Sequence, residues 1–106
     1  MEVKKYHRKY PDSKWEYRAI STKVFDERSY RMNEIIYYTL IDKGRKSRGV
    51  EVYSGENYIV GCFDERSYSR SYSMPNVPAK YKSIVNELMR VHKSTTWSKE
   101  KYVNLN

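Results

Sequence analysis

Basic side chains gather in three segments of this chain, two of which also contain tyrosines, and this combination could bind phosphate groups and stack on bases. The segments are the N-terminal stretch MEVKKYHRKY, the polar stretch DKGRKSRG and the serine-rich stretch SYSRSYS. Lysine and arginine neutralise backbone phosphates, and each base stacked on an aromatic ring contributes about 1–3 kcal/mol. The candidate nucleic-acid-binding residues are Lys4, Lys5, Arg8, Lys9, Lys43, Arg45, Lys46, Arg48, Tyr53, Tyr58, Arg66, Tyr68, Arg70 and Tyr72.

The net charge favours a polyanionic partner. The 106 residues include 21 Lys and Arg against 13 Asp and Glu, which gives a formal net charge of +8. The 12 tyrosines would contribute most where bases are unpaired, so we expect RNA or single-stranded DNA as the partner. The sequence therefore predicts a small basic nucleic-acid-binding protein.

Catalytic chemistry has little support. The two histidines, His7 and His92, stand in no recognisable acid–base or metal-ligand spacing, and we expect His92 to be buried or to cap a helix. The sequence contains no glycine-rich nucleotide loop in a strand-to-helix context. We therefore expect a non-catalytic protein with no cofactor and no metal. A small metal-independent ribonuclease using Lys, Arg and Tyr stays a second alternative.

A protein partner is the main alternative. Tyrosine and arginine dominate the energetic hot spots of protein interfaces, and a small basic domain suits an inhibitor. In this reading the chain is a viral or mobile-element protein that binds an acidic host protein, for example a defence nuclease. Binding to phosphates should weaken steeply with salt, whereas an aromatic interface should weaken less.

Cellular location is predicted from two absences in the sequence. No stretch approaches the roughly 20 apolar residues that cross a bilayer, and the first ten residues lack the apolar core of a signal peptide. The single cysteine, Cys62, permits no internal disulfide, as is usual in a reducing compartment. We expect a cytoplasmic protein that does not associate with membranes.

The elements that would position these residues form one domain over residues 1–106. Residues 1–10 read as a basic arm or edge strand, and 15–25 as a strand. NEIIYYTLID is ambiguous between strand and helix; a helix over 29–42 would give a β-α-β-β-α order. We favour a strand, because the turn DKGRKSRG and the alternating strand GVEVYS follow it.

Helical spacing first becomes clear after the two prolines of SMPNVP. Apolar residues recur at positions i, i+3, i+4 and i+7 over 78–93, which predicts a helix, with a docked tail over 94–106. The expected fold is α+β: an antiparallel meander of about four strands with one C-terminal helix on one face. Alternation places Val50 and Val52 toward the core and Tyr53 with Tyr58 on the opposite face. There the tyrosines either pack beneath a helix or tail or form a stacking platform.

The hexapeptide FDERSY occurs twice, at residues 25–30 and 63–68. Each copy follows a predicted strand, so we interpret it as a strand exit whose phenylalanine anchors the core. A local duplication without shared function is one explanation. The other is that Arg28, Tyr30, Arg66 and Tyr68 occupy equivalent positions and contact a repeating ligand such as a nucleic-acid backbone.

Overall fold

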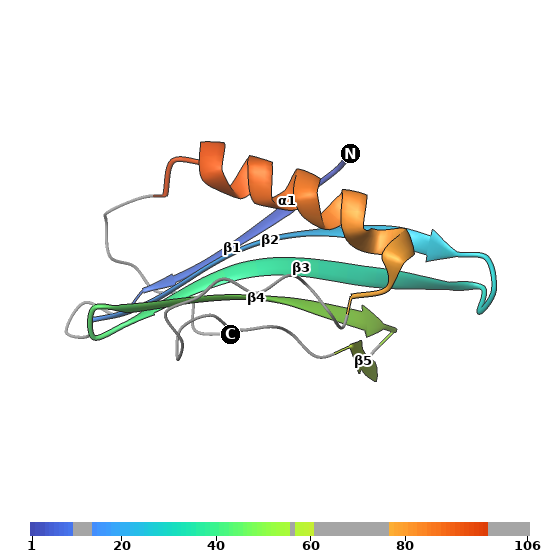
Figure 1. Cartoon of the computed structure of the whole chain (residues 1–106), viewed down its shortest axis with the longest axis horizontal. Helices are drawn as coiled ribbons and strands as arrows, with labels where there is room; N and C mark the ends of the chain where they lie inside the picture. The colour runs from blue at the N-terminus through green and yellow to red at the C-terminus, as the bar shows by residue number, and fades with distance from the viewer. Residues whose placement is uncertain (10–13, 56, 61–76, 98–106) are drawn as a thin grey trace.

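The fold was obtained as a computed structural model that describes residues 1–9, 14–55, 57–60 and 77–97. One antiparallel sheet has the strands in chain order (Figure 1). They are β1 (Lys4–Lys9), β2 (Trp15–Asp26), β3 (Arg31–Asp42), β4 (Arg45–Ser54) and the short β5 (Asn57–Val60). A 3₁₀ turn, η1 (Ala79–Tyr81), leads into the helix α1 (Lys82–Ser94). The predicted α+β meander with a C-terminal helix is confirmed.

Strand β3 resolves the ambiguous segment as a strand. Its buried residues alternate with less buried ones along Asn33, Ile35, Tyr37 and Thr39, and a helix would have grouped them every three to four positions. β-Branched and tyrosine side chains favour this extended backbone. A tight turn at Lys43 and Gly44, both with positive φ, then returns the chain into β4.

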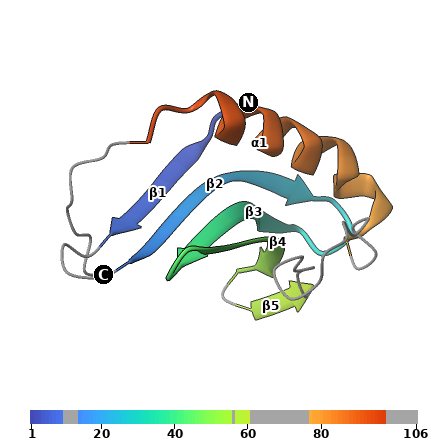
Figure 2. The same cartoon turned by 60° about the vertical axis from the view of Figure 1, so that its left-hand side comes forward.

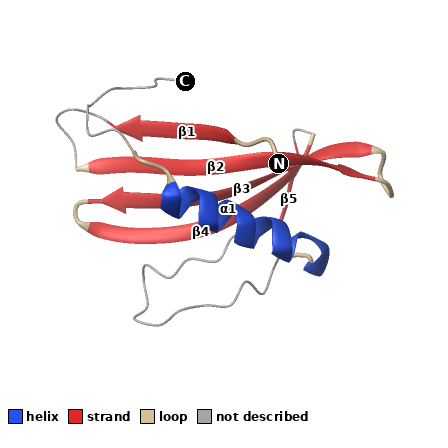
Figure 3. Cartoon of the chain, turned by 90° about the horizontal axis from the view of Figure 1, so that it is seen from above, coloured by secondary structure: helices blue, strands red, loops and turns tan. Residues whose placement is uncertain are grey.

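Helix α1 lies across one face of the sheet, as Figures 1 and 3 show. Its buried residues Val85 and Leu88 pack on a core that includes Ile20 from β2, Ile35 from β3 and Val50 from β4. Val52 is also buried in this core, as alternation predicted, and Tyr53 lies on the opposite face. The core therefore occupies the layer between the helix and the three central strands.

The first FDERSY copy forms the turn between β2 and β3. Asp26 ends β2, and its carboxylate accepts hydrogen bonds from the Arg28 backbone N–H at 3.2 Å and the Ser29 hydroxyl at 3.0 Å. Such side-chain-to-backbone bonds stabilise turns. The strand-exit interpretation is confirmed for this copy, and the second copy lies outside the described residues.

Phe25 does not anchor the core, and that prediction is wrong. Its side chain is 54% exposed and meets the 82% exposed Tyr30 edge to face, with ring centroids 5.9 Å apart. The β2–β3 hairpin continues past the core at this end, and Phe25 shares the face opposite the helix with Lys23. The ring contact of Phe25 among the described residues is therefore with Tyr30 of its own hairpin, away from the core.

The face opposite the helix is built around a small residue. Gly49 on β4 lies beneath the ring of Tyr38, and a Cβ atom there would be 2.5 Å from the tyrosine hydroxyl oxygen. Tyr38 in turn stacks on Tyr17 with ring centroids 5.7 Å apart.

The twist and curvature of the strands are visible in Figure 2. Among the described residues, no helix has the length and apolar character needed to span a membrane.

Candidate nucleic-acid interface

The predicted basic residues do not share one face of the sheet but are distributed over both. Side chains of adjacent residues in a strand point to opposite faces. On β4, Lys46 and Arg48 therefore face the helix side, while Arg45 faces the other side. On β1, Lys5 and Lys9 share the helix side, and Lys4 and Arg8 lie opposite. Lys43 is exposed in the β3–β4 turn.

The helix side contains a cavity of about 740 Å³ beside the end of α1, here called the cationic basin. Its lining has a concentration of positive charge with no aspartate or glutamate among the described residues that form it. The basic lining residues are Arg18, Lys46, Arg48, Arg90, His92 and Lys93; the others are Tyr37, Thr39, Met89, Thr95 and Trp97. Anions are the ligands that such a lining attracts.

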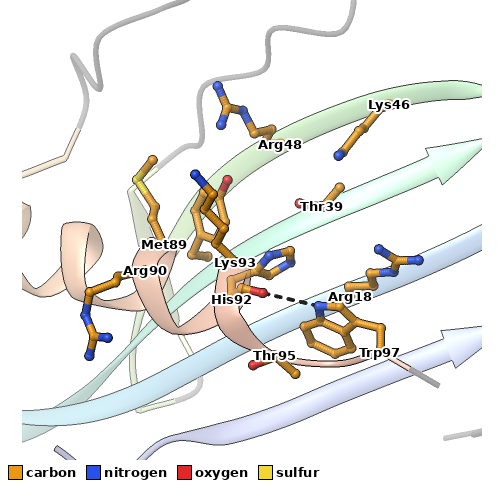
Figure 4. Close-up of a pocket in the computed structure, with 11 residues that line it drawn as sticks. Arg18, Thr39, Lys46, Arg48, Met89, Arg90, His92, Lys93, Thr95 and Trp97 are labelled. Carbon is orange, nitrogen blue, oxygen red and sulfur yellow. Dashed lines mark hydrogen bonds between the residues drawn. The ribbon is translucent and has the colours of Figure 1, made fainter.

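Pairing of the strands places several of these side chains next to one another. Thr39 on β3 pairs with Arg18 on β2 and with Arg48 on β4, so a row of polar side chains crosses three strands. Figure 4 shows Arg18, Thr39 and Lys46 rising from the sheet beside the His92 ring, while Arg90 extends away from them. Arg90 is paired with Glu87 on its own helix. The inner part of the basin is therefore formed by strand residues and by His92.

Two lysines of the basin are not neutralised by a carboxylate. Among the described residues, no aspartate or glutamate lies within ion-pairing distance of Lys46 or Lys93. Unneutralised positive charges in a partly enclosed cavity concentrate anions, because field lines are focused by the low-dielectric walls. These two ammonium groups are therefore available for phosphate oxygens.

Glu16 forms a buried ionic cluster next to the basin. Its carboxylate lies 2.7 Å from His7 Nε2 and 2.8 Å from Arg18 Nε, with Lys9 Nζ at 4.0 Å. Burial would raise the pKa of Glu16, but hydrogen bonds from Arg18 and His7 outweigh burial and lower this pKa. The ionised carboxylate holds the Arg18 side chain at the edge of the basin.

We predict that Glu16→Gln lowers the free energy of unfolding by about 1–3 kcal/mol at pH 7, since Arg18 and His7 lose a charged acceptor. Because the folded-state pKa of Glu16 lies below its ordinary 4.5, this stabilisation is complete above pH 4.5 and is lost as pH falls through the folded-state value. Urea denaturation at several pH values measures the difference in free energy of unfolding between the variant and the wild type. Glu27→Gln, at an exposed turn residue, is the control; equal losses in both variants would contradict the prediction.

His92 and Trp97 close the basin at the end of α1. The indole N–H of Trp97 donates to the His92 carbonyl oxygen at 3.3 Å (Figure 4). The Trp97 ring contacts the rings of His92 and His7, with centroids 5.1 and 5.3 Å away, and Lys5 Nζ lies 5.7 Å from its centroid. Trp97 thus docks the start of the C-terminal segment on β1 and on the helix.

The opposite face carries tyrosines whose rings and hydroxyls already have partners. Tyr6 donates to Glu34 at 3.1 Å, and Tyr53 donates to Glu51 at 3.1 Å. Arg8 lies over the Tyr17 ring at 5.6 Å, and burial raises the pKa of Tyr17 to about 12. Two carboxylates on this face make it less suitable for phosphates than the basin.

Part of the predicted site lies outside the described residues: the Tyr58 side chain, Arg66, Tyr68, Arg70 and Tyr72. Conversely, the basin includes Arg18, His92 and Lys93, which sequence reasoning did not select. Arg18 is the only basic residue between Lys14 and Lys23, Lys93 lies on a helix face whose charges read as solvated, and His92 was expected to be buried or capping. Strand register could have identified Arg18, because pairing of β2 with β3 and of β3 with β4 sets it in line with Arg48.

No protein-family model, curated protein or solved structure matches this chain. In the part of the chain that the structure describes, no three His, Cys, Asp or Glu residues gather as a metal site requires. The fold defines the class of protein as a small α+β domain with a helix on one face of an antiparallel meander. Functional inference therefore depends on the basin itself.

Proposed function

We propose that this protein binds nucleic acid, with backbone phosphates held in the cationic basin. The observation that carries the proposal is the lining of the basin, where five Lys and Arg residues from β2, β4 and α1 surround one cavity without an acidic residue among its described lining. A formal net charge of +8 would add long-range attraction. Lys5 and Lys9 extend the positive surface along β1.

The basin supplies phosphate contacts more readily than base contacts. Its aromatic residues Tyr37 and Trp97 are engaged in ring contacts with His92, so neither presents both faces to a base. Phosphate contacts are independent of sequence and strongly dependent on salt. We therefore expect binding with little sequence preference, and single-stranded RNA or DNA is the first ligand to test.

Fluorescence anisotropy with labelled single- and double-stranded oligonucleotides, from low to physiological salt, tests the proposal. We expect affinity to fall steeply with salt. Lys46→Gln should reduce the slope of log affinity against log salt by about 0.7 for a single strand, the value of one phosphate contact.

Arg45→Gln is the matched control, because it removes one charge at the adjacent position but on the opposite face. Its slope should stay close to that of the wild type. Equal changes in the two variants would assign binding to net charge and not to the basin. Labelled RNA recovered from the same samples should remain full length on a denaturing gel, whereas cleavage would favour a ribonuclease.

A protein partner is the second candidate, and a different surface favours it. Phe25, Tyr30 and Met32 are large side chains exposed together at the end of the β2–β3 hairpin. An acidic protein could contact the basic surface while these residues supply apolar contact. Absence of oligonucleotide binding at low salt would move the assignment to this candidate.

A further inference from the structure

We propose that binding of a phosphate in the cationic basin is coupled to protonation of His92, so that nucleic acid binds more tightly as the pH falls below neutral. The inference rests on the proposed function and concerns how the same site is regulated. It starts from the position of the His92 ring, which is held on the inner side of the basin by the strands and by Trp97.

One nitrogen of the His92 ring is buried beside the basin without a partner. Nε2 has no hydrogen-bond partner among the described residues. A buried polar nitrogen without a partner costs free energy, so this atom gains from any change that satisfies it. The ring also contacts the rings of Tyr37 and Trp97, which fix its position against the sheet.

The charged groups that face His92 are mostly positive. The charged and titratable groups come from every element around the ring: Lys5 and His7 of β1 beyond Trp97, Glu16 and Arg18 of β2, the neutral Tyr37 of β3, Lys46 and Arg48 of β4, and Lys93 of α1. The only carboxylate among them, Glu16, is hydrogen-bonded to Arg18 and His7. In the free protein this environment favours the neutral imidazole.

Burial lowers the pKa of His92, the hydrogen bond to the Arg18 backbone opposes it, and the charges of Arg18 and Lys46 lower it further. A phosphate between Arg18 and Lys46 would offset these two charges and favour the imidazolium. The bound-state pKa then exceeds the free-state pKa. Binding therefore takes up a proton, and affinity rises as pH falls from the bound-state toward the free-state value.

Direct contact between Nε2 and the phosphate is not required. The negative charge of the phosphate would raise the pKa of His92 across a short distance. Electrostatic interactions in a partly enclosed cavity are screened less than in water. A rise of one pKa unit on binding would correspond to tenfold tighter binding at the low-pH limit. We expect binding three- to tenfold tighter at pH 5.5 than at pH 8.

Oligonucleotide affinity measured between pH 5.5 and 8 tests the inference, because phosphodiesters stay ionised over this range. His92→Asn keeps a side-chain N–H near the Nδ1 position and removes the titrating ring. This variant should bind with an affinity that hardly changes with pH. His7→Asn is the matched control for the other histidine and should retain the wild-type pH dependence.

A measurement on the unmodified protein protects the test against a folding defect in the variants. The ring proton of His92, followed by NMR with and without the oligonucleotide, should titrate at a higher pH in the complex. An unshifted titration with pH-independent affinity would overturn this inference and leave the proposed function intact. Absence of oligonucleotide binding at low salt and pH 5.5 would overturn both.

Discussion

Reversing two charges inside the basin, as Lys46→Glu with Lys93→Glu, should weaken oligonucleotide binding at low salt by at least about 100-fold. Both ammonium groups lack a carboxylate partner among the described residues, so each substitution removes an attraction and adds a repulsion. Like charges brought together at a binding surface cost several kcal/mol, and about 2.7 kcal/mol corresponds to 100-fold. Anisotropy titrations at constant salt measure this change.

The control reverses the same number of charges outside the basin, as Lys43→Glu with Arg45→Glu on the β3–β4 hairpin. These residues were among the phosphate contacts expected from sequence, so the comparison also decides between the hairpin tip and the basin. We expect only a few-fold loss, caused by the lower net charge. A greater loss here than with the basin variant would place the phosphates at the hairpin tip.

Leu88→Ala should lower the free energy of unfolding by about 2–5 kcal/mol, the largest stability effect that we predict. Leu88 is fully buried and lies in the hydrophobic cluster through which α1 packs on the sheet. Truncation removes apolar contacts and leaves a cavity that the long strands cannot readily collapse to fill. Urea denaturation followed by tryptophan fluorescence measures the loss.

Asn86→Ala, at an exposed position of the same helix, serves as the control and should change stability by no more than about 0.5 kcal/mol. A loss below about 1 kcal/mol for Leu88→Ala would show that α1 contributes little to stability. Because α1 forms one wall of the basin, contacts other than those of Leu88 would then have to hold that wall in place.

The strands and the helix could be predicted because their signals are local. Alternation of apolar and polar residues marks β4, and recurrence every three to four residues marks α1. The β3 segment carried both signals, and its β-branched and tyrosine residues together with the turn after it favoured the correct choice. The failure at Phe25 has a non-local cause, because the hairpin extends past the core there.

The candidate site could be predicted only in part. Lys46 and Arg48 were selected from charge alone, but Arg45 was grouped with them although alternation sends its side chain to the other face. Arg18 and Lys93 come from segments far apart in the chain, and no short-range pattern relates them. His92 was expected to be buried or capping, and it is half-buried beside the basin, with its Nε2 atom fully buried.

The sequence by itself determined the excess of positive charge, the order of strands and helix, and which residues alternate along each strand. These properties follow from composition and from the two backbone periodicities. Only the tertiary structure decided which face of the sheet α1 covers and therefore which basic residues share a cavity. Strand register and helix docking are set by the packing of distant residues such as Ile35 and Leu88, so no local pattern could specify the basin.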